Sequence, residues 1–307
     1  MPNRPITADE RKHWSTLGHI LALEAISEIS EWTRTDYAFH GGTSLHLSWN
    51  SPRFSEDLDF LLSDACDERL PKIMDRVISR IHENLLKIDH ALIISMTGKN
   101  RGRLADYRFV LSKPGVIGSV MIKAEFWKVD PLYLMSYRST SKTPAAPADM
   151  LGGYTLAVSP ILPAGTLTAA YLDKLTAFAT RPHLKWRDIF DFWWITNHAG
   201  FTPPGDIVSA FLQNLSAYST VDELKPEEAL RQFTTRFSRE DMLAAAVKDL
   251  KPFLPAGMWN RFWPDTVAEM VDVTLAGVAD VAELVAKHPD NIQAARGPTE
   301  APDGAPV

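Results

Sequence analysis

The chain has 307 residues, of which 45% are hydrophobic and 23% are charged, so it has the composition of a globular protein with one large or two modest domains. Its single cysteine, Cys66, excludes an internal disulfide and a cysteine-rich metal site, and its net charge of −6 argues against a protein that coats nucleic acid. The first residues lack the apolar run of a signal peptide and no stretch of 18 uncharged apolar residues occurs, so we expect a cytoplasmic protein without a membrane span.

Helices and strands alternate in the first half of the chain. Apolar residues at helical spacing predict helices over residues 7–33, 43–49 and 67–86. Short apolar or alternating runs predict strands over residues 37–39, 57–62, 91–96, 104–111, 117–127 and 132–137. A basic turn at 98–103, which contains two glycines, joins the third of these strands to the fourth.

The second half of the chain is mainly helical. A surface loop at 139–148 and a short strand at 154–158 precede it. Helical periodicity then predicts helices over residues 166–180, 185–197, 204–216, 221–237, 239–250 and 264–287. This order of elements indicates an α+β fold, with an α/β domain over 1–160, a helical domain over 161–289 and a disordered tail over 290–307.

The strand over 57–62 begins with Asp57-Leu58-Asp59. Because side chains alternate along a strand, Asp57 and Asp59 project from the same face. Two adjacent carboxylates repel each other unless a cation lies between them, and oxygen ligands of this kind suit Mg²⁺. Taken alone, this motif is more commonly explained without a metal, as two solvated acids or as an aspartate paired with Arg53.

A glycine turn with two hydroxyl side chains precedes this strand, as Gly41-Gly42-Thr43-Ser44. A glycine turn that leads into a helix directs backbone N–H groups outward and forms a ready anion site, to which Thr43 or Ser44 can add a hydroxyl. Alone, the glycine pair fits any tight turn. Followed within 20 residues by the Asp-Leu-Asp strand, it favours a site for a phosphate and a metal.

These two motifs resemble the AbiEii/AbiGii toxin branch of the nucleotidyltransferase superfamily. The resemblance rests on G-G-T-S-L at 41–45 and R-F-S-E-D-L-D at 53–59, with 13 residues between Thr43 and Asp57. It implies a nucleotidyltransferase-like mixed β-sheet with flanking helices, followed by an α-helical C-terminal half. It also implies two Mg²⁺ ions held by Asp57, Asp59 and a third carboxylate.

The third carboxylate is expected from a later strand. In the run over 117–127, Glu125 is the single acid and shares a face with Met121 and Lys123, so it is the candidate for the catalytic and metal-binding role. The alternative interpretation is a salt bridge from Glu125 to Lys123 or Arg108.

A second segment, YLDKLTAFATRPHLKWRDIFDFWW at 171–194, is similar to the family's Asp-Lys … Arg … Arg-Asp-x-x-Asp pattern. Lys174 and Arg181 share a helix face, and Asp188 and Asp191 are spaced i, i+3 on the next helix. The resemblance assigns Lys174, a catalytic candidate, to the NTP phosphates and Arg181, Asp188 and Asp191 to the same nucleotide site. Alone, the segment also fits a solvated helix hairpin with ion pairs.

The resemblance further implies a toxin of a toxin–antitoxin or phage-defence (abortive-infection) pair, with a cognate antitoxin encoded nearby. Its expected reaction is NMP transfer from an NTP to an RNA acceptor, the tRNA 3′ end, which blocks translation. The stretch 96–128 carries seven basic and two acidic residues and would bind such an acceptor, although a solvated hairpin face explains it equally well. Two rivals stay open, namely transfer to a protein hydroxyl and an NTP-binding toxin that docks on its target without transfer.

Overall fold

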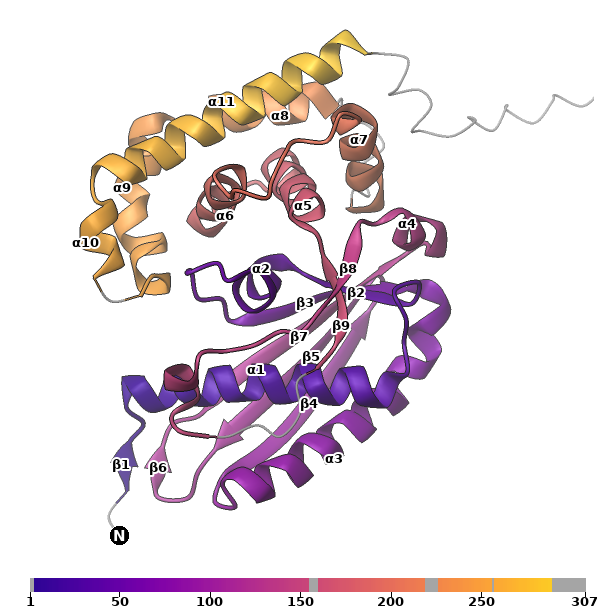
Figure 1. Cartoon of the computed structure of the whole chain (residues 1–307), viewed down its shortest axis with the longest axis vertical. Helices are drawn as coiled ribbons and strands as arrows, with labels where there is room; N and C mark the ends of the chain where they lie inside the picture. Colours follow the sequence, from indigo (N-terminus) through magenta and orange to yellow (C-terminus); the bar gives the residue numbers. More distant parts are fainter. Residues whose placement is uncertain (1–2, 155–159, 219–225, 256, 289–307) are drawn as a thin grey trace, which may run out of the picture. The chain divides into compact units, whose positions relative to one another are not determined.

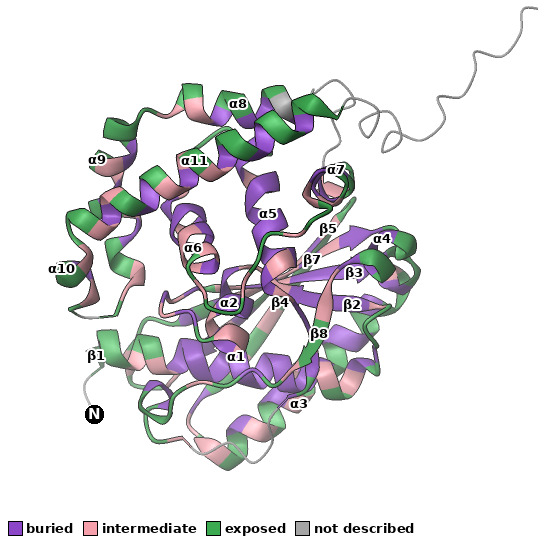
Figure 2. Ribbon diagram, turned by 45° about the horizontal axis from the view of Figure 1, so that its top comes forward, coloured by how far each residue is buried: buried purple, intermediate pink, exposed green. Residues whose placement is uncertain are grey.

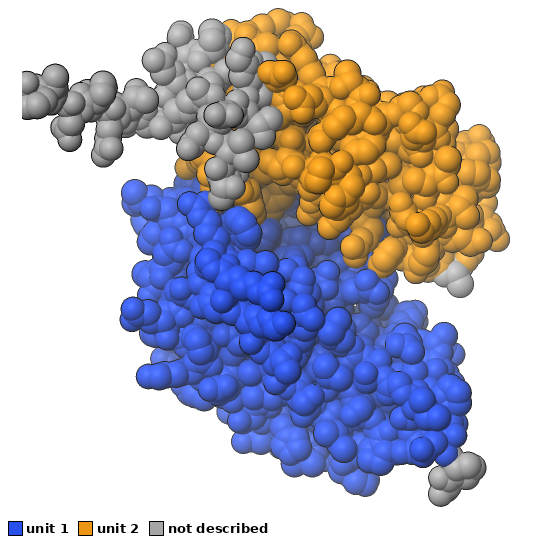
Figure 3. Space-filling view, turned by 180° about the vertical axis from the view of Figure 1, so that it is seen from behind, with its two compact units in different colours: residues 1–170 blue, residues 171–307 orange. Residues whose placement is uncertain are grey.

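The computed structural model describes residues 3–154, 160–218, 226–255 and 257–288. The chain divides into two compact units, Met1–Ala170 and Tyr171–Val307, which are coloured separately in Figure 3. None of the helices in the described ranges is long and apolar enough to cross a membrane.

A seven-stranded mixed sheet forms the centre of the first unit, in the order β4-β5-β7-β3-β2-β9-β8 (Figure 1). β3 runs parallel to β7 and antiparallel to β2, so the sheet is mixed, as the family resemblance implies. A separate pair joins β1 to β6. The strands are β1 (Arg4–Pro5), β2 (Tyr37–His40), β3 (Asp57–Ser63), β4 (Ile93–Arg101), β5 (Leu104–Ser112), β6 (Val116–Ile117), β7 (Val120–Val129), β8 (Ser139–Lys142) and β9 (Leu162–Gly165).

Two long helices, α1 (Ala8–Ser30) and α3 (Leu70–Ile88), cover one face of this sheet (Figure 1). Alternate strand residues such as Phe60 and Phe126 point into that face, where their rings stack with centroids 4.8 Å apart. Burial of such an aromatic side chain contributes about 1.5 to 3 kcal/mol each. Figure 2 shows the result as buried strand positions and a buried inner surface of α1. The residues between them, including Asp57 and Asp59, lie on the opposite face of the sheet.

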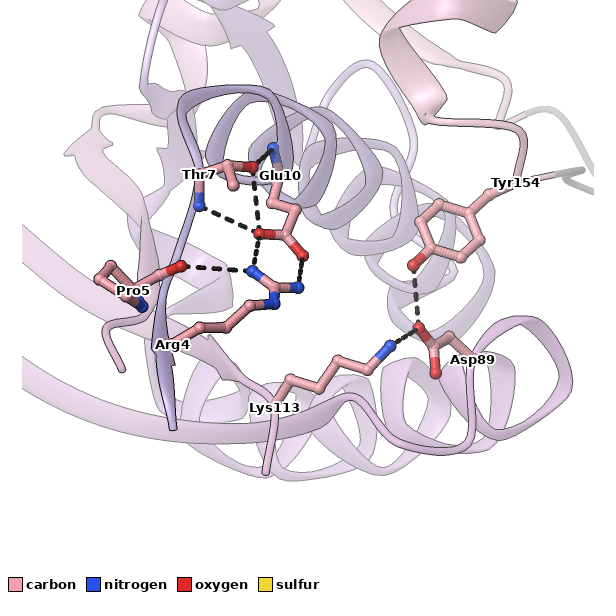
Figure 4. Close-up of polar contacts among 7 residues, drawn as sticks. All are labelled: Arg4, Pro5, Thr7, Glu10, Asp89, Lys113 and Tyr154. Carbon is pink, nitrogen blue, oxygen red and sulfur yellow. Dashed lines mark hydrogen bonds and ion pairs between the residues drawn. The ribbon is translucent and has the colours of Figure 1, made fainter. Parts of the chain in front are cut away.

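Side-chain contacts fix the start of α1 and the end of α3 (Figure 4). Thr7 and Glu10 form a capping box at the start of α1, and Arg4 donates to Glu10 at 2.7 Å. Asp89, which caps α3, accepts hydrogen bonds from Lys113 at 2.7 Å and from the Tyr154 hydroxyl at 3.0 Å. These contacts tie β1 to the start of α1 and the turn after β5 to the end of α3.

The second unit is helical. Its core includes Tyr171 and Phe178, which lie against Phe192 with ring centroids 4.9 and 5.6 Å away. The helices of the C-terminal half are α5 (Leu167–Thr180), α6 (Trp186–Thr196), α7 (Ile207–Tyr218), α8 (Pro226–Arg236), α9 (Arg239–Asp249), α10 (Met258–Phe262) and α11 (Asp265–Lys287).

One predicted strand is wrong. Residues 132–136 lie in α4 (Pro131–Ser136) and Tyr137 is its C-cap, because the Asp130 side chain accepts from the Leu132 N–H and Pro131 occupies the first helical turn.

The predicted loop at 139–148 begins with the strand β8, and the predicted turn at 98–103 is shorter, since β4 continues to Arg101. The predictions omitted β9 and α10. The helix predicted from residue 67 begins as a 3-10 turn, Asp64–Arg69, and the described part of the helix predicted at 221–237 is α8. Most of the strand predicted at 154–158, and the tail at 290–307, lie outside the described residues.

Candidate active site

The glycine turn brings a helix N-terminus against the second aspartate of the Asp-Leu-Asp motif. α2 (Gly41–Trp49) begins directly after β2, and Gly41 has a φ of +75°, in the left-handed region that favours glycine. A Cβ at Gly41 would lie 2.2 Å from Asp59 Oδ2. Only glycine therefore allows the first turn of α2 to approach Asp59 this closely.

The second glycine packs against the Arg-Phe-Ser part of the motif. A Cβ at Gly42 would lie 2.3 Å from Arg53 Nη2 and 2.8 Å from Ser55 Oγ. Arg53 is almost completely buried and donates to the Phe54 carbonyl at 2.9 Å. Arg53 is thus part of the support of the turn, and the glycine provides the space for its guanidinium.

The two hydroxyl residues of the turn bond inside the protein. Thr43 Oγ1 donates to the Asp57 carbonyl, and Ser44 Oγ donates to the Phe39 carbonyl at 3.3 Å. Both side chains are buried. In this structure the hydroxyls fix α2 to β3 and β2, and the N–H groups of the first turn of α2 are the donors suited to an anion.

Two histidines, His19 buried and His46 partly buried, position the loop before Asp57, and the sequence analysis did not single them out. His19 Nε2 lies 2.8 Å from the Glu56 carbonyl, and His46 Nδ1 lies 2.7 Å from the Ser51 carbonyl. Burial lowers the pKa of His19 to about 4, so its ring is neutral and donates to Glu56. The signal in the sequence was a lone histidine within the apolar run LGHILAL.

The strand register places the predicted third carboxylate beside the Asp-Leu-Asp motif. β3 and β7 pair in parallel, with Asp57 opposite Lys123 and Asp59 opposite Glu125. Residues in register share a face of the sheet, so these four side chains project together. The structure therefore brings Asp57, Asp59 and Glu125 to one face.

The next strand adds a fourth carboxylate that the sequence analysis did not single out. β5 pairs with β7 so that Asp106 lies opposite Glu125 and Arg108 opposite Lys123. Arg108 pairs with Asp106 at 3.0 Å. We call this side of β3, β7 and β5 the carboxylate face, defined by Asp57, Asp59, Asp106, Arg108, Lys123 and Glu125.

Glu125 forms an ion pair on this face. Lys123 Nζ lies 2.6 Å from Glu125 Oε1, and both side chains are about one quarter exposed. Burial works to lower the pKa of Lys123, but the hydrogen bond that Lys123 donates to Glu125 and the charges of Glu125, Asp57 and Asp106 outweigh it and raise that pKa. The salt bridge that the sequence offered as an alternative role for Glu125 is thus present.

The donor types of the carboxylate face fit the magnesium that the family pattern implies. Asp57 and Asp59 are hard oxygen ligands on one face, beside the turn formed by Gly41 and Gly42, which we call the glycine cradle. Glu125 shares their face, but its carboxylate is engaged by Lys123. Within the described ranges, no three His, Cys, Asp or Glu side chains gather as a ready metal site.

The second predicted constellation lies in the second unit, on α5 and α6. Lys174 Nζ lies 2.8 Å from Asp188 Oδ1 and 2.7 Å from Asp191 Oδ2, and Arg181 also contacts Asp188. Burial alone would raise the pKa of Asp188, but the charges of Lys174 and Arg181 hold it well below its ordinary value. The structure thus joins all four predicted residues of this segment in one charge-balanced cluster, which we call the Lys174 cluster.

Comparison with known proteins identifies the family. The sequence model of the nucleotidyl transferase AbiEii toxin family, of type IV toxin–antitoxin systems, matches residues 32–273. The sequence matches none of the curated proteins with which it was compared.

Solved structures share the fold. MenT4, a nucleotidyltransferase toxin from Mycobacterium tuberculosis H37Rv, superposes with a TM-score of 0.57 at 19% identity, covering 94% of each chain. A protein from H. pylori assigned as a nucleotidyltransferase superposes with a TM-score of 0.50 at 17% identity, covering 88% of this chain and 96% of that one. The family match spans most of the chain, including both predicted constellations, so the chain belongs to the AbiEii nucleotidyl transferase toxin family and is a nucleotidyltransferase.

Proposed function

We propose that this nucleotidyltransferase moves an NMP from an NTP to an RNA hydroxyl, the 3′ end of a tRNA, with release of pyrophosphate, and so inhibits translation. The observation that carries the proposal is the register of β3 with β7, which sets Asp57, Asp59 and Glu125 on one face beside a helix N-terminus.

The first unit supplies the groups suited to the reacting phosphate. Asp57, Asp59 and Glu125 would hold magnesium ions, which polarise the acceptor hydroxyl and neutralise the leaving pyrophosphate. The backbone N–H groups at Gly42 and the next residues would bind the triphosphate, since a helix N-terminus favours anions. Arg53 and the buried hydroxyl of Thr43 keep this turn in place against β3.

The Lys174 cluster gives Lys174 a fixed position. A lysine bonded to two buried aspartates loses little further conformational entropy when it binds a phosphate. In this proposal, as the family resemblance implies, Lys174 would contact the NTP phosphates, and Asp188 and Asp191 would orient its ammonium.

Not all basic residues of the stretch 96–128 are available to bind RNA in the structure. Lys113 pairs with Asp89, and Lys128 is buried with three hydrogen-bond acceptors around it. In contrast, Lys99 and Arg101 are exposed on β4, and Lys99 lies in register with Asp106. Exposed cations on the same face as the carboxylates support an acceptor that is an RNA backbone.

A cognate antitoxin is the expected partner, because the family is described for type IV toxin–antitoxin systems. The proposal does not depend on the antitoxin, and it can be tested on the isolated chain.

Label transfer tests the proposed acceptor. The purified chain is incubated with Mg²⁺, a cell extract and each of the four α-³²P NTPs, and the RNA and protein fractions are counted separately. We expect label in tRNA-sized RNA with one preferred nucleotide, and none from Asp57→Asn/Asp59→Asn. Label in protein would instead identify a protein hydroxyl as the acceptor. No label in either fraction would contradict nucleotide transfer.

A further inference from the structure

A lysine lies among the carboxylates that the proposed reaction needs. Lys123 Nζ is 2.6 Å from Glu125 Oε1, on a side chain that projects from the same face as Asp57 and Asp59. In register, Lys123 is flanked by Asp57 on β3 and by Arg108 on β5. The charges of Glu125, Asp57 and Asp106 all act on its ammonium.

Four carboxylates on one sheet face repel one another strongly unless cations lie among them. Arg108 forms an ion pair with Asp106 at 3.0 Å, at the outer side of the carboxylate face. Lys123 has the central position, between the strand of Asp59 and the strand of Asp106. An ammonium there neutralises part of the charge that a divalent ion would neutralise when it binds.

We propose that Lys123 is the resident counter-cation of the carboxylate face, and that its ammonium competes with the divalent metal for the Glu125 carboxylate. The inference rests on the proposed function, because it assigns Glu125 to the metal. It adds that Glu125 exchanges one cation for another, and that Lys123 is a positioning residue that sets how readily the metal binds before nucleotide arrives.

The geometry supports exchange rather than a permanent bond. The Lys123–Glu125 pair is about one quarter exposed, so water can solvate either partner when the pair opens. Lys123 also has a flexible four-carbon side chain, whereas Arg108 is held as a fork on Asp106. A metal that takes Glu125 leaves Lys123 near Asp57 and Asp106.

Metal binding without nucleotide tests the inference directly. Mn²⁺ affinity of the full chain is measured by electron paramagnetic resonance, which counts free Mn²⁺ and needs no enzymatic activity. We expect Lys123→Met to bind Mn²⁺ at least about tenfold more tightly than wild type, because the competing charge is gone. The gain should disappear in Lys123→Met/Glu125→Gln.

Arg108→Met is the matched control, since it removes the same charge one strand away. We expect it to change Mn²⁺ affinity less than about threefold, because Arg108 forms its ion pair with Asp106, and the charge of Glu125 is the smallest of the influences on the pKa of Arg108. Lys123→Arg keeps the charge and should stay near wild type. If Lys123→Met fails to fold, Lys123→Gln replaces it, and we expect the same gain in Mn²⁺ affinity.

Thermal unfolding gives a second readout. In EDTA, Lys123→Met should melt below wild type, because the carboxylates have lost their counter-cation. Saturating MgCl₂ should raise its midpoint more than that of wild type, since the tighter site gives more binding free energy.

Equal or weaker Mn²⁺ binding by Lys123→Met would overturn the inference and leave the proposed transfer reaction in place. Equal gains in Lys123→Met and Arg108→Met would also overturn it, because the effect would then be a general one of net charge. Binding by none of the variants would contradict both the inference and a metal-dependent reaction.

Discussion

The lysine–carboxylate pair on the carboxylate face and the Lys174 cluster differ in burial and in the number of carboxylates that contact the lysine. On the carboxylate face, Lys123 contacts Glu125 and both side chains are 24–28% exposed. In the Lys174 cluster, Lys174 contacts two aspartates whose side chains are 8% and 0% exposed. The Lys123–Glu125 pair is open to water and can exchange its cation, whereas the buried Lys174 cluster is fixed. The first group can therefore respond to a ligand, and the second holds its lysine in a rigid position.

Removal of one partner should give the largest contrast between these groups. Asp191→Ala leaves a buried lysine with one aspartate fewer and should cost about 3–5 kcal/mol of unfolding free energy. Glu125→Ala removes an exposed partner and should cost about 1 kcal/mol or less. Urea unfolding of the two variants beside wild type measures both values. Similar losses would show that the two groups do not differ as the structure indicates.

Acid titration tests a buried group within the first unit. His19 has a pKa of about 4 in the folded chain against 6.5 in the unfolded one, so the unfolded chain takes up a proton first as the pH falls. The contribution of His19 to the free energy of unfolding is complete above pH 6.5. That free energy should decrease by about 2–3 kcal/mol as the pH falls to 4. His19→Gln should flatten this part of the profile of unfolding free energy against pH. An unchanged profile would mean that another group titrates there.

The glycine cradle should be sensitive in activity more than in stability. Gly41→Ala strains a φ of +75° and places a Cβ against Asp59, so we expect about 10- to 100-fold slower transfer and about 1–2 kcal/mol lower stability. Gly102→Ala is the control, because Gly102 has a φ of +54° with nothing within 4 Å of its added Cβ. It should lose similar stability but keep transfer. An equal loss of transfer in Gly41→Ala and Gly102→Ala would contradict a special role of the glycine cradle in the reaction.

The smallest expected effect is on RNA affinity. Lys99→Glu/Arg101→Glu reverses exposed charge on β4 and should weaken tRNA binding several-fold, with the salt slope reduced by about 1 to 2. Lys72→Glu/Arg76→Glu makes the same change on the exposed surface of α3 and should leave binding unchanged. Filter binding over a range of salt concentrations measures both. Equal weakening would show that RNA binding depends on the net charge of the chain rather than on the exposed cations of β4.

The sequence predicted the elements with strong periodicity and the short strand β2, but it missed other short elements such as β8 and β9. The predicted strand at 57–62 and helix at 185–197 correspond to β3 and α6, because their apolar residues recur regularly. β8 and β9 are four residues each, and three of the four residues in β8 are serine or lysine while β9 contains proline, alanine and glycine, so local propensity gives them little signal. The strand predicted at 132–137 failed because a short apolar run outweighed the helix-start signal of Asp130-Pro131.

The site follows the same division between local and long-range information. Alternation along one strand was enough to put Asp57 and Asp59 on one face. The place of Asp106 and the ion pair of Lys123 depend on which strands pair and in which register, and those pairings are long-range. Sequence alone therefore gave Glu125 two alternative roles, and the structure shows the ion pair with Lys123.

The most direct test compares two aspartates on the same face. Transfer of label from the preferred NTP into tRNA is measured for Asp59→Asn and for Asp106→Asn, which both neutralise a carboxylate in register with Glu125. The account predicts a loss of about 1000-fold or more for Asp59→Asn and of about threefold or less for Asp106→Asn. Full transfer by a folded Asp59→Asn would contradict the assignment of the reaction to the carboxylate face.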